Sequence, residues 1–317
     1  MEENKSIIFG PVPSRRLGHS MGINNIPPKI CTYSCAYCQL SLTIKVQIER
    51  QIFYDKEYIF QAVNDKVNLT RKSGEMIDYL TFVSDGEPTL DINLGFEIDL
   101  LKPFSIPVAV ITNSSLIWQP DVRQDLMRAD WVSLKIDAVE DRIWHKIDHP
   151  HRKLDLDLIL EGVIEFSRSF TGKLVTETML VENINDSDQH IAQVADFLSN
   201  IKPDIAYLAI PTRPPADKRV KAPDEHILNQ AYNIFKDKVK DVEYLTGYEG
   251  DAFAFTGNIE EDILSITAVH PMRADAIEVL LGRTGKDWSV IHKMIADNQL
   301  AETMYEGHKF YLRRFKK

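Results

Sequence analysis

The chain has 317 residues, of which 44% are hydrophobic and 26% charged, and its formal net charge is -10. These values are typical of a folded globular protein and exclude a disordered chain. The acidic charge disfavours extensive nonspecific contact with nucleic acid, which needs a basic surface. No apolar run is long enough to span a bilayer. Residues 1–6 contain no apolar signal core, so we expect a cytoplasmic protein without membrane contact.

All three cysteines lie in one short stretch, which reads Cys31-Thr32-Tyr33-Ser34-Cys35-Ala36-Tyr37-Cys38. It follows residues 7–30, whose many Gly and Pro residues predict a constrained loop with one short strand. Three thiols at this spacing could hold three corners of an iron–sulfur cube and leave one iron open for a small molecule. A structural zinc site and ordinary free thiols are the alternatives. Zinc sites usually contain two separated ligand pairs, and no second pair of cysteines is present.

After the cysteines, apolar β-type runs alternate with helical segments. The predicted strands cover residues 76–83, 107–111, 131–136, 174–180 and 205–210. The predicted helices cover residues 56–71, 119–129, 156–170 and 187–200. This alternation indicates right-handed crossovers and a parallel sheet. Together with the short strand before Cys31, it predicts an α/β fold with six units, a partial (β/α)6 TIM-like barrel over residues 1–222.

Polar residues follow the ends of the predicted strands. They are Asp85, Gly86 and Glu87 after the first of these strands, Thr112 and Asn113 after the second, Lys135 and Asp137 at the third, and Glu177 on the fourth. In barrels, residues at the carboxyl ends of the strands build the active site. We therefore expect these side chains to lie around one pocket.

The pattern changes beyond the barrel. Residues 223–258 are expected to form a connector, with a helix near residues 225–239 and a short strand at residues 252–255. Residues 259–317 predict three short helices followed by a hairpin whose turn contains Glu306-Gly307. Three helices and a terminal hairpin are typical of a winged helix, so we expect a C-terminal winged-helix-like domain.

The loop Cys31-x-x-x-Cys35-x-x-Cys38, with the aromatic Tyr37 before its last cysteine, resembles the signature of the radical S-adenosylmethionine (radical SAM) superfamily. The resemblance extends from residue 10 to about residue 215. It implies that Cys31, Cys35 and Cys38 bind a 4Fe-4S cluster. It also implies that S-adenosylmethionine occupies the open iron and is cleaved to methionine and a 5'-deoxyadenosyl radical, which abstracts hydrogen from a substrate.

The same resemblance implies roles for the polar residues. Ser84-Asp85-Gly86-Glu87-Pro88 is similar to the Gly-Gly-Glu type motif that receives the methionine ammonium, with Asp85 where a glycine often stands. Tyr37 matches the position that contacts adenine, and Thr112 and Asn113 match a position near the ribose and the methionine carboxylate. Lys135, Asp137 and Glu177 match strand ends that line the cofactor pocket.

Within the superfamily, the stretch from Gly10 to Gly18 resembles relatives of the tRNA wyosine-base synthases. Those synthases carry further cysteines for a second cluster, and this chain has three cysteines in all. That count argues against a wyosine-forming reaction and indicates a single cluster.

The sequence thus predicts a radical SAM enzyme whose substrate is not identified. Two alternatives to this prediction stay open. One is modification of a tRNA base, and the other is a non-catalytic iron–sulfur sensor whose winged helix binds nucleic acid. The substrate could be a protein, a peptide, RNA or a small molecule. The enzyme reading further implies a reductant such as flavodoxin or ferredoxin.

Overall fold

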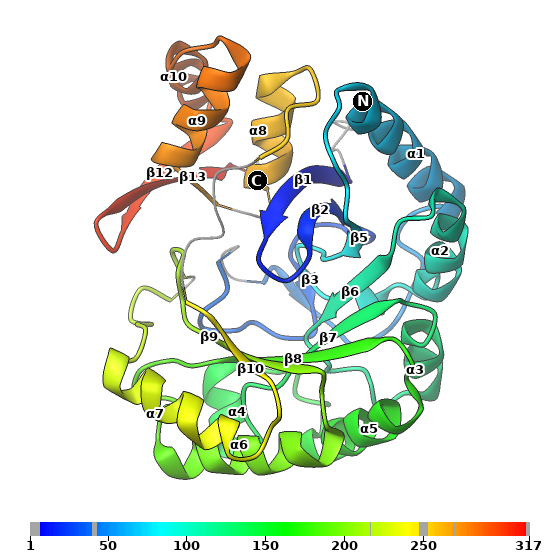
Figure 1. The fold of residues 1–317 in the computed structure, drawn as a ribbon, viewed down its shortest axis with the longest axis vertical. Helices are drawn as coiled ribbons and strands as arrows, with labels where there is room; N and C mark the ends of the chain where they lie inside the picture. Colours follow the sequence, from blue (N-terminus) through cyan, green and yellow to red (C-terminus); the bar gives the residue numbers. More distant parts are fainter. Residues whose placement is uncertain (1–6, 40–42, 216, 247–252, 269–270, 315–317) are drawn as a thin grey trace.

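The computed structural model describes residues 7–39, 43–215, 217–246, 253–268 and 271–314. Its centre is an eight-stranded sheet with the order β1-β2-β5-β6-β7-β8-β9-β10. The strands are β1 (Ile8–Ser14), β2 (Gly18–Ile23), β5 (Tyr79–Phe82), β6 (Val108–Thr112), β7 (Trp131–Lys135), β8 (Lys173–Met179), β9 (Ile205–Ala209) and β10 (Val242–Leu245). From β2 to β10 all neighbours are parallel, and β1 pairs antiparallel with β2 at one edge. The sheet curls into a half-barrel (Figure 1), which confirms the predicted partial barrel.

Helices cover the outer face of this sheet (Figure 1). They are α1 (Lys56–Lys72), α2 (Leu94–Leu101), α3 (Pro120–Leu126), α4 (Asp141–Ile147), α5 (Leu156–Ser169), α6 (Asp188–Ile201) and α7 (Glu225–Lys236). Two short 3-10 turns, η1 (Pro88–Leu90) and η2 (Lys102–Phe104), flank α2. Side-chain oxygens of Asp55, Asp155 and Ser187 cap the first turns of α1, α5 and α6. Among the described helices, none has the length and apolar character that a membrane span requires.

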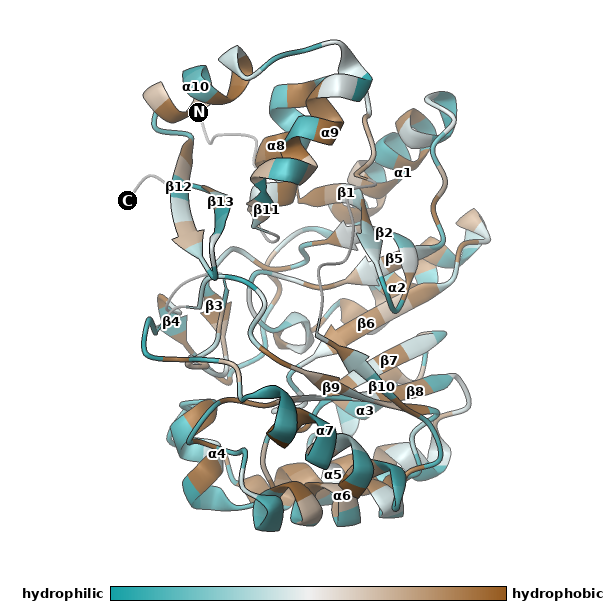
Figure 2. Cartoon of the chain, turned by 60° about the vertical axis from the view of Figure 1, so that its left-hand side comes forward, coloured by the Kyte–Doolittle hydropathy of each residue, from teal (hydrophilic) through white to brown (hydrophobic). Residues whose placement is uncertain are grey.

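The core lies between these helices and the sheet. In α5 the buried residues Ile159, Val163 and Phe166 recur at helical spacing and pack on the sheet, while the charged side turns to solvent (Figure 2). The six expected strands are β2 and β5 to β9. The structure adds β1 and β10 to the sheet. The helix predicted near residues 225–239 is α7. The strand predicted at residues 252–255 does not form at residues 253–255, which the structure describes, and the connector instead contributes β10, which lies before that stretch and pairs with β9.

The C-terminal part has the element order helix, strand, helix, helix, strand, strand. Its members are α8 (Ile259–Thr267), β11 (Met272–Arg273), α9 (Ala274–Thr284), α10 (Ser289–Ala296), β12 (Leu300–Tyr305) and β13 (His308–Arg313). The strands form an antiparallel sheet of order β11-β13-β12. Phe9 and Val12 of β1 belong to the same apolar cluster as Ile263 of α8 and Ile277 of α9. This part therefore packs on the antiparallel edge of the half-barrel.

Candidate active site

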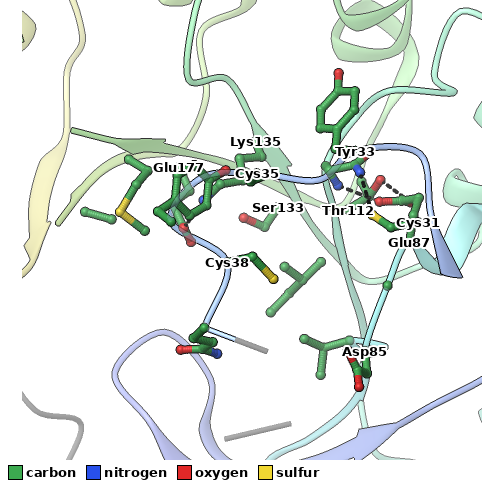
Figure 3. Close-up of a pocket in the computed structure, with 18 of the residues that line it drawn as sticks. Cys31, Tyr33, Cys35, Cys38, Asp85, Glu87, Thr112, Ser133, Lys135 and Glu177 are labelled. Carbon is green, nitrogen blue, oxygen red and sulfur yellow. Dashed lines mark hydrogen bonds and ion pairs between the residues drawn. The ribbon is translucent and has the colours of Figure 1, made fainter. Parts of the chain in front are cut away.

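A cavity of about 320 Å³ opens inside the half-barrel, at the carboxyl ends of the parallel strands. Figure 3 shows the three cysteines, Glu87, Lys135 and Glu177 around it. The residues that sequence analysis places at the site and that line this cavity are Cys31, Tyr37, Cys35, Cys38, Asp85, Gly86, Glu87, Thr112, Asn113, Lys135 and Glu177. Asp137 is the one expected site residue that does not line it.

The cysteine loop begins where β3 (Ile30–Cys31) ends; β3 pairs with β4 (Lys45–Val46). None of the three cysteines forms a disulfide, and each residue is half-buried. Burial of the sulfur atom, and then the nearby carboxyl group of Glu87, raise the pKa of Cys31 to about 12. Burial, followed by Asp148, likewise raises the pKa of Cys35. Without a metal both thiols stay protonated at neutral pH, so positive charge from a cluster is what would make them thiolates.

The three thiols fit an iron–sulfur cube better than a single metal ion. Over the described residues, no three His, Cys, Asp or Glu side chains gather as they would around one ion. A cube spreads three thiolates over three different irons, and so needs cysteines that line one cavity without touching. Cys31, Cys35 and Cys38 are arranged in this way.

The turn after β5 is held tightly against the segment before the cysteines. Lys29 N donates to Asp85 O at 2.7 Å, and Lys29 Nζ lies 3.2 Å from Asp85 Oδ1. Burial raises the pKa of Asp85 to about 6, although Lys29 opposes the shift. A Cβ atom on Gly86 would lie 1.8 Å from Ile30 O. The residue after Asp85 therefore has to be glycine for the two segments to meet.

Glu87 is buried and accepts four hydrogen bonds. Oε1 accepts from Thr89 N at 3.0 Å and from the hydroxyls of Thr89 and Thr112, both at 2.6 Å. Oε2 accepts from Asn113 N at 2.7 Å. Burial raises the pKa of Glu87, and the donors of Thr112, Thr89 and Asn113 oppose that shift. These donors fix the carboxyl group at the cavity wall, where Oε2 retains capacity for a further donor.

Asn113 connects the end of β6 to the cysteine loop. Its Nδ2 donates to Thr32 Oγ1 at 2.8 Å and lies 3.5 Å from Cys31 Sγ. Ser115 Oγ also donates to Thr32 Oγ1, at 2.6 Å. The loop, the turn that contains Glu87 and the end of β6 thus form one hydrogen-bonded unit.

The cavity also contains a half-buried group of charges. Glu177 lies 2.6 Å from Lys135 Nζ and 2.5 Å from Arg16 Nη1. Burial alone would raise the pKa of Glu177, but the two cations outweigh it and lower that pKa to about 2. Asp137 and Glu177 overcome burial and raise the pKa of Lys135. Glu177 and Lys135 therefore remain charged at neutral pH.

Asp137 lies behind the cavity wall. It accepts from Met179 N at 2.7 Å and from the Tyr37 hydroxyl, which also donates to Asp148 Oδ1 at 3.2 Å. A separate cavity of about 10 Å³, the size of one water molecule, lies beside Asp137 and Asp148. In this arrangement Asp137 positions Tyr37 and does not face the main cavity.

Several residues at the site were not identified from the sequence: Lys29, Thr32, Ser115 and Asp148. Lys29, Thr32 and Ser115 lie within two residues of an expected site residue, and that proximity was the available signal. Asp148 lies far from every motif and meets Cys35 Sγ, at 3.3 Å, only through folding. Arg16, in the stretch from Gly10 to Gly18, is a further residue of the site, and its partner is Glu177.

Comparison with known proteins gives a family match over the barrel. The family model described as the radical SAM superfamily matches residues 25–197. The UPF0026 protein of Methanocaldococcus jannaschii is 46% identical over 313 residues, which cover 98% of this chain and 97% of that protein.

More distant similarities include a probable RNA methyltransferase and a solved structure. A probable dual-specificity RNA methyltransferase, RlmN of Desulforamulus reducens, is 23% identical over 62% of this chain and 55% of its own length. The solved structure of TYW1 with a lysine–pyruvate adduct has a TM-score of 0.54. It is 13% identical over 69% of this chain and 74% of that chain, and this similarity establishes the fold alone.

Proposed function

The chain belongs to the radical SAM superfamily of enzymes, and we propose that it holds one 4Fe-4S cluster by Cys31, Cys35 and Cys38 and cleaves S-adenosylmethionine reductively. The observation that carries the proposal is the shared cavity, which Cys31, Cys35 and Cys38 line together with Glu87 and Asn113. The cluster would supply one electron to the sulfonium, and the resulting 5'-deoxyadenosyl radical would remove hydrogen from the substrate.

The residues of the chain would position S-adenosylmethionine. Oε2 of Glu87 would accept from the methionine ammonium, since its other bonds fix it at the wall. Gly86, at the cavity wall, lets the turn that carries Glu87 pack against Ile30 and so keeps Glu87 beside the cysteine loop. Thr112 and Asn113 would lie beside the ribose and carboxylate, and Tyr37 beside the adenine. Lys135 and Glu177 would line the remaining cavity, with Asp137 acting on Tyr37 from behind.

To test this proposal, the cluster is reconstituted anaerobically with iron and sulfide, and it is then reduced in the presence of S-adenosylmethionine. We expect 5'-deoxyadenosine from the wild-type protein, and loss of iron and product from Cys35→Ala. Glu87→Gln should keep the cluster absorbance but lose most S-adenosylmethionine binding. The exposed Glu182→Gln is the matched control. A reconstituted cluster that yields no 5'-deoxyadenosine with any reductant would refute the enzyme proposal. If such a cluster controlled DNA binding, the sensor alternative would replace it.

We further propose that residues 259–314 form a winged-helix-like substrate-recognition domain. The order of its helices and its three-stranded sheet support this reading. Tyr305, at the end of β12, donates its hydroxyl to Pro211 O at 3.1 Å, and Pro211 lines the cavity. The hairpin β12–β13 therefore lies beside the mouth through which a substrate would enter.

RNA is the second candidate as a substrate, because the similarity to RlmN favours it. The three-cysteine count leaves no ligands for a second cluster of the wyosine-synthase type. Mass spectrometry of nucleosides and of proteins, from cells with and without the gene, would separate RNA modification from protein modification. A nucleoside that disappears in the deletion strain would assign RNA, and an altered peptide would assign protein.

A further inference from the structure

The cysteine loop separates two hollows. Cys35 and Tyr37 line the main cavity, while Ala36, between them in sequence, lines a groove of about 490 Å³ on the outer side. The two hollows share no lining residue. The groove therefore gives access to the back of the loop that holds the proposed cluster, away from the proposed S-adenosylmethionine site.

Two basic segments build this outer side. Residues 145–153 and 217–221 together contain six Lys or Arg and three His, against two Asp, in a chain with a net charge of -10. Asp148 is one of those two acids, and it is buried. Asp217 is the other, and its carboxylate lies 2.8 Å from Arg219. Glu182 is a further exposed acid that lines the groove.

The exposed cations have few partners of their own. Within the residues that the structure describes, Lys146, Lys218 and Lys221 form no ion pair, and all three are exposed. Uncompensated lysines on a strongly acidic protein mark a site that attracts negative charge. We call the side chains of Lys146, Lys218, Arg219 and Lys221 the basic patch.

The basic segments touch the cysteine loop through its backbone. Ala36 N donates to Ile147 O at 2.9 Å, Ser34 N to Asp148 O at 3.0 Å, and His151 N to Thr32 O at 2.9 Å. On the other side Asp217 N donates to Ala36 O at 3.1 Å. A protein seated on the patch would thus lie against the peptide groups that flank Cys35.

From these observations we propose that the basic patch docks a small acidic electron-carrier protein of the flavodoxin kind. The inference rests on the proposed function, because the proposed chemistry consumes one electron per cleavage. The reduced carrier would lose one electron and the oxidised cluster would gain it. Transient redox partners form small interfaces that opposite charge steers. A surface behind the cluster loop suits such a partner better than a substrate, which has to reach the cavity on the other side.

The variant for the test is Lys146→Glu/Lys221→Glu. Its control is Lys72→Glu/Lys286→Glu, which makes the same charge change at exposed lysines on α1 and before α10. We expect the patch variant to bind flavodoxin at least about tenfold more weakly at low salt, with the control close to wild type. Binding by the wild-type protein should weaken as salt rises, because the attraction is screened over about 10 Å at 0.1 M. Binding is followed by the fluorescence of the carrier, so that this readout needs no turnover.

Reduction of the reconstituted cluster separates this proposal from the proposed function. The patch variant should accept electrons slowly from reduced flavodoxin and at the wild-type rate from dithionite. If dithionite gives no 5'-deoxyadenosine even with wild-type protein, the proposed function fails instead. Equal flavodoxin binding by the patch variant and the control overturns the docking proposal. The docking proposal is also overturned if the patch variant loses affinity for total tRNA but keeps its affinity for flavodoxin.

Discussion

Arg16 Nη1 lies 2.5 Å from Glu177 Oε2, although the two residues are 161 positions apart in the sequence. Arg16 belongs to the turn between β1 and β2, and Glu177 belongs to β8. The guanidinium lies 6.0 Å from the ring centroids of Trp131 and Tyr207. This ion pair joins the antiparallel edge of the sheet to its middle through the interior of the half-barrel.

Removing the carboxylate of this pair should destabilise the protein strongly. Glu177→Gln removes the carboxylate that Arg16 and Lys135 share, while their side chains are only 12% and 19% exposed. Loss of one partner from a fully buried pair costs about 3–5 kcal/mol, so the low end of that range applies to this half-buried group. We expect a fall of that size in the free energy of unfolding, measured by urea titration. Glu165→Gln is the control, since Glu165 lies 2.6 Å from Arg123 but is 60% exposed, and it should cost less than about 1 kcal/mol. Equal losses in the two variants would contradict the buried role of Glu177.

Protonation of the same carboxyl group, that of Glu177, should account for part of the stability that the protein loses in acid. Its pKa is about 2 in the folded protein, below its ordinary value of 4.5. A group with a lowered folded pKa stabilises the protein fully above its unfolded pKa, and this contribution is lost as pH falls from 4.5 towards 2. Urea titrations over this range should show a steeper loss of stability for wild type than for Glu177→Gln. Parallel curves would show that Glu177 does not titrate with unfolding.

Gly86→Ala should disturb the cysteine loop through the contact between Gly86 and Ile30. The new Cβ would meet Ile30 O at 1.8 Å, one residue before Cys31. Relief of this clash has to move β3, so we expect a loss of about 3 kcal/mol in stability and a lower iron content after reconstitution. Gly74→Ala is the control, because Gly74 also has a positive φ, of 76°, but nothing within 4 Å of its Cβ position. An unchanged iron content in Gly86→Ala would contradict the close contact.

The sequence predicted most of the sheet, because most of the central strands are mainly apolar, as strands covered on both faces require. Residues 107–111 and 205–210, for example, fall on β6 and β9. The polar residues after those strands followed from the rule that strand ends meet at one edge. The family resemblance over the barrel is likewise confirmed by the match to residues 25–197.

The rest depended on contacts between distant segments. Strand β11 has two residues and exists only because Met272 and Arg273 pair with Tyr311 and Phe310. Nothing near Asp137 in the sequence indicates that Tyr37 and Met179 enclose its carboxylate. Its spacing after β7 put it at the correct end of the strand, but the direction of its side chain was set by folding.

The buried carboxyl group of Glu97 should make the folded protein less stable as pH rises. It is buried in α2, and burial, followed by the charge of Asp91, raises its pKa from 4.5 to about 9. Because the folded state binds this proton more tightly, stability falls as pH rises from 4.5 to 9, by up to about 1.4 kcal/mol per pH unit for one group. Glu97→Gln, which cannot ionise, should remove this slope between neutral and alkaline pH in urea titrations. The exposed Glu161→Gln should keep it, and a slope that persists in Glu97→Gln would assign it to other groups.

Lys66 links the C-terminal part to the barrel. On α1, its Nζ lies 3.1 Å from Asp262 Oδ1 of α8 and 2.8 Å from Thr256 Oγ1. Asp262 is 2% exposed and keeps only the donors of Thr256 when the lysine is removed. Lys66→Met should therefore cost about 2 kcal/mol. Hydrogen exchange should localise the loss, with faster exchange in α8 and unchanged protection in β6 and β7, because regions can open separately. The exposed Lys72→Met is the control on the same helix. Uniformly faster exchange throughout the chain would instead show that the two parts unfold as one unit.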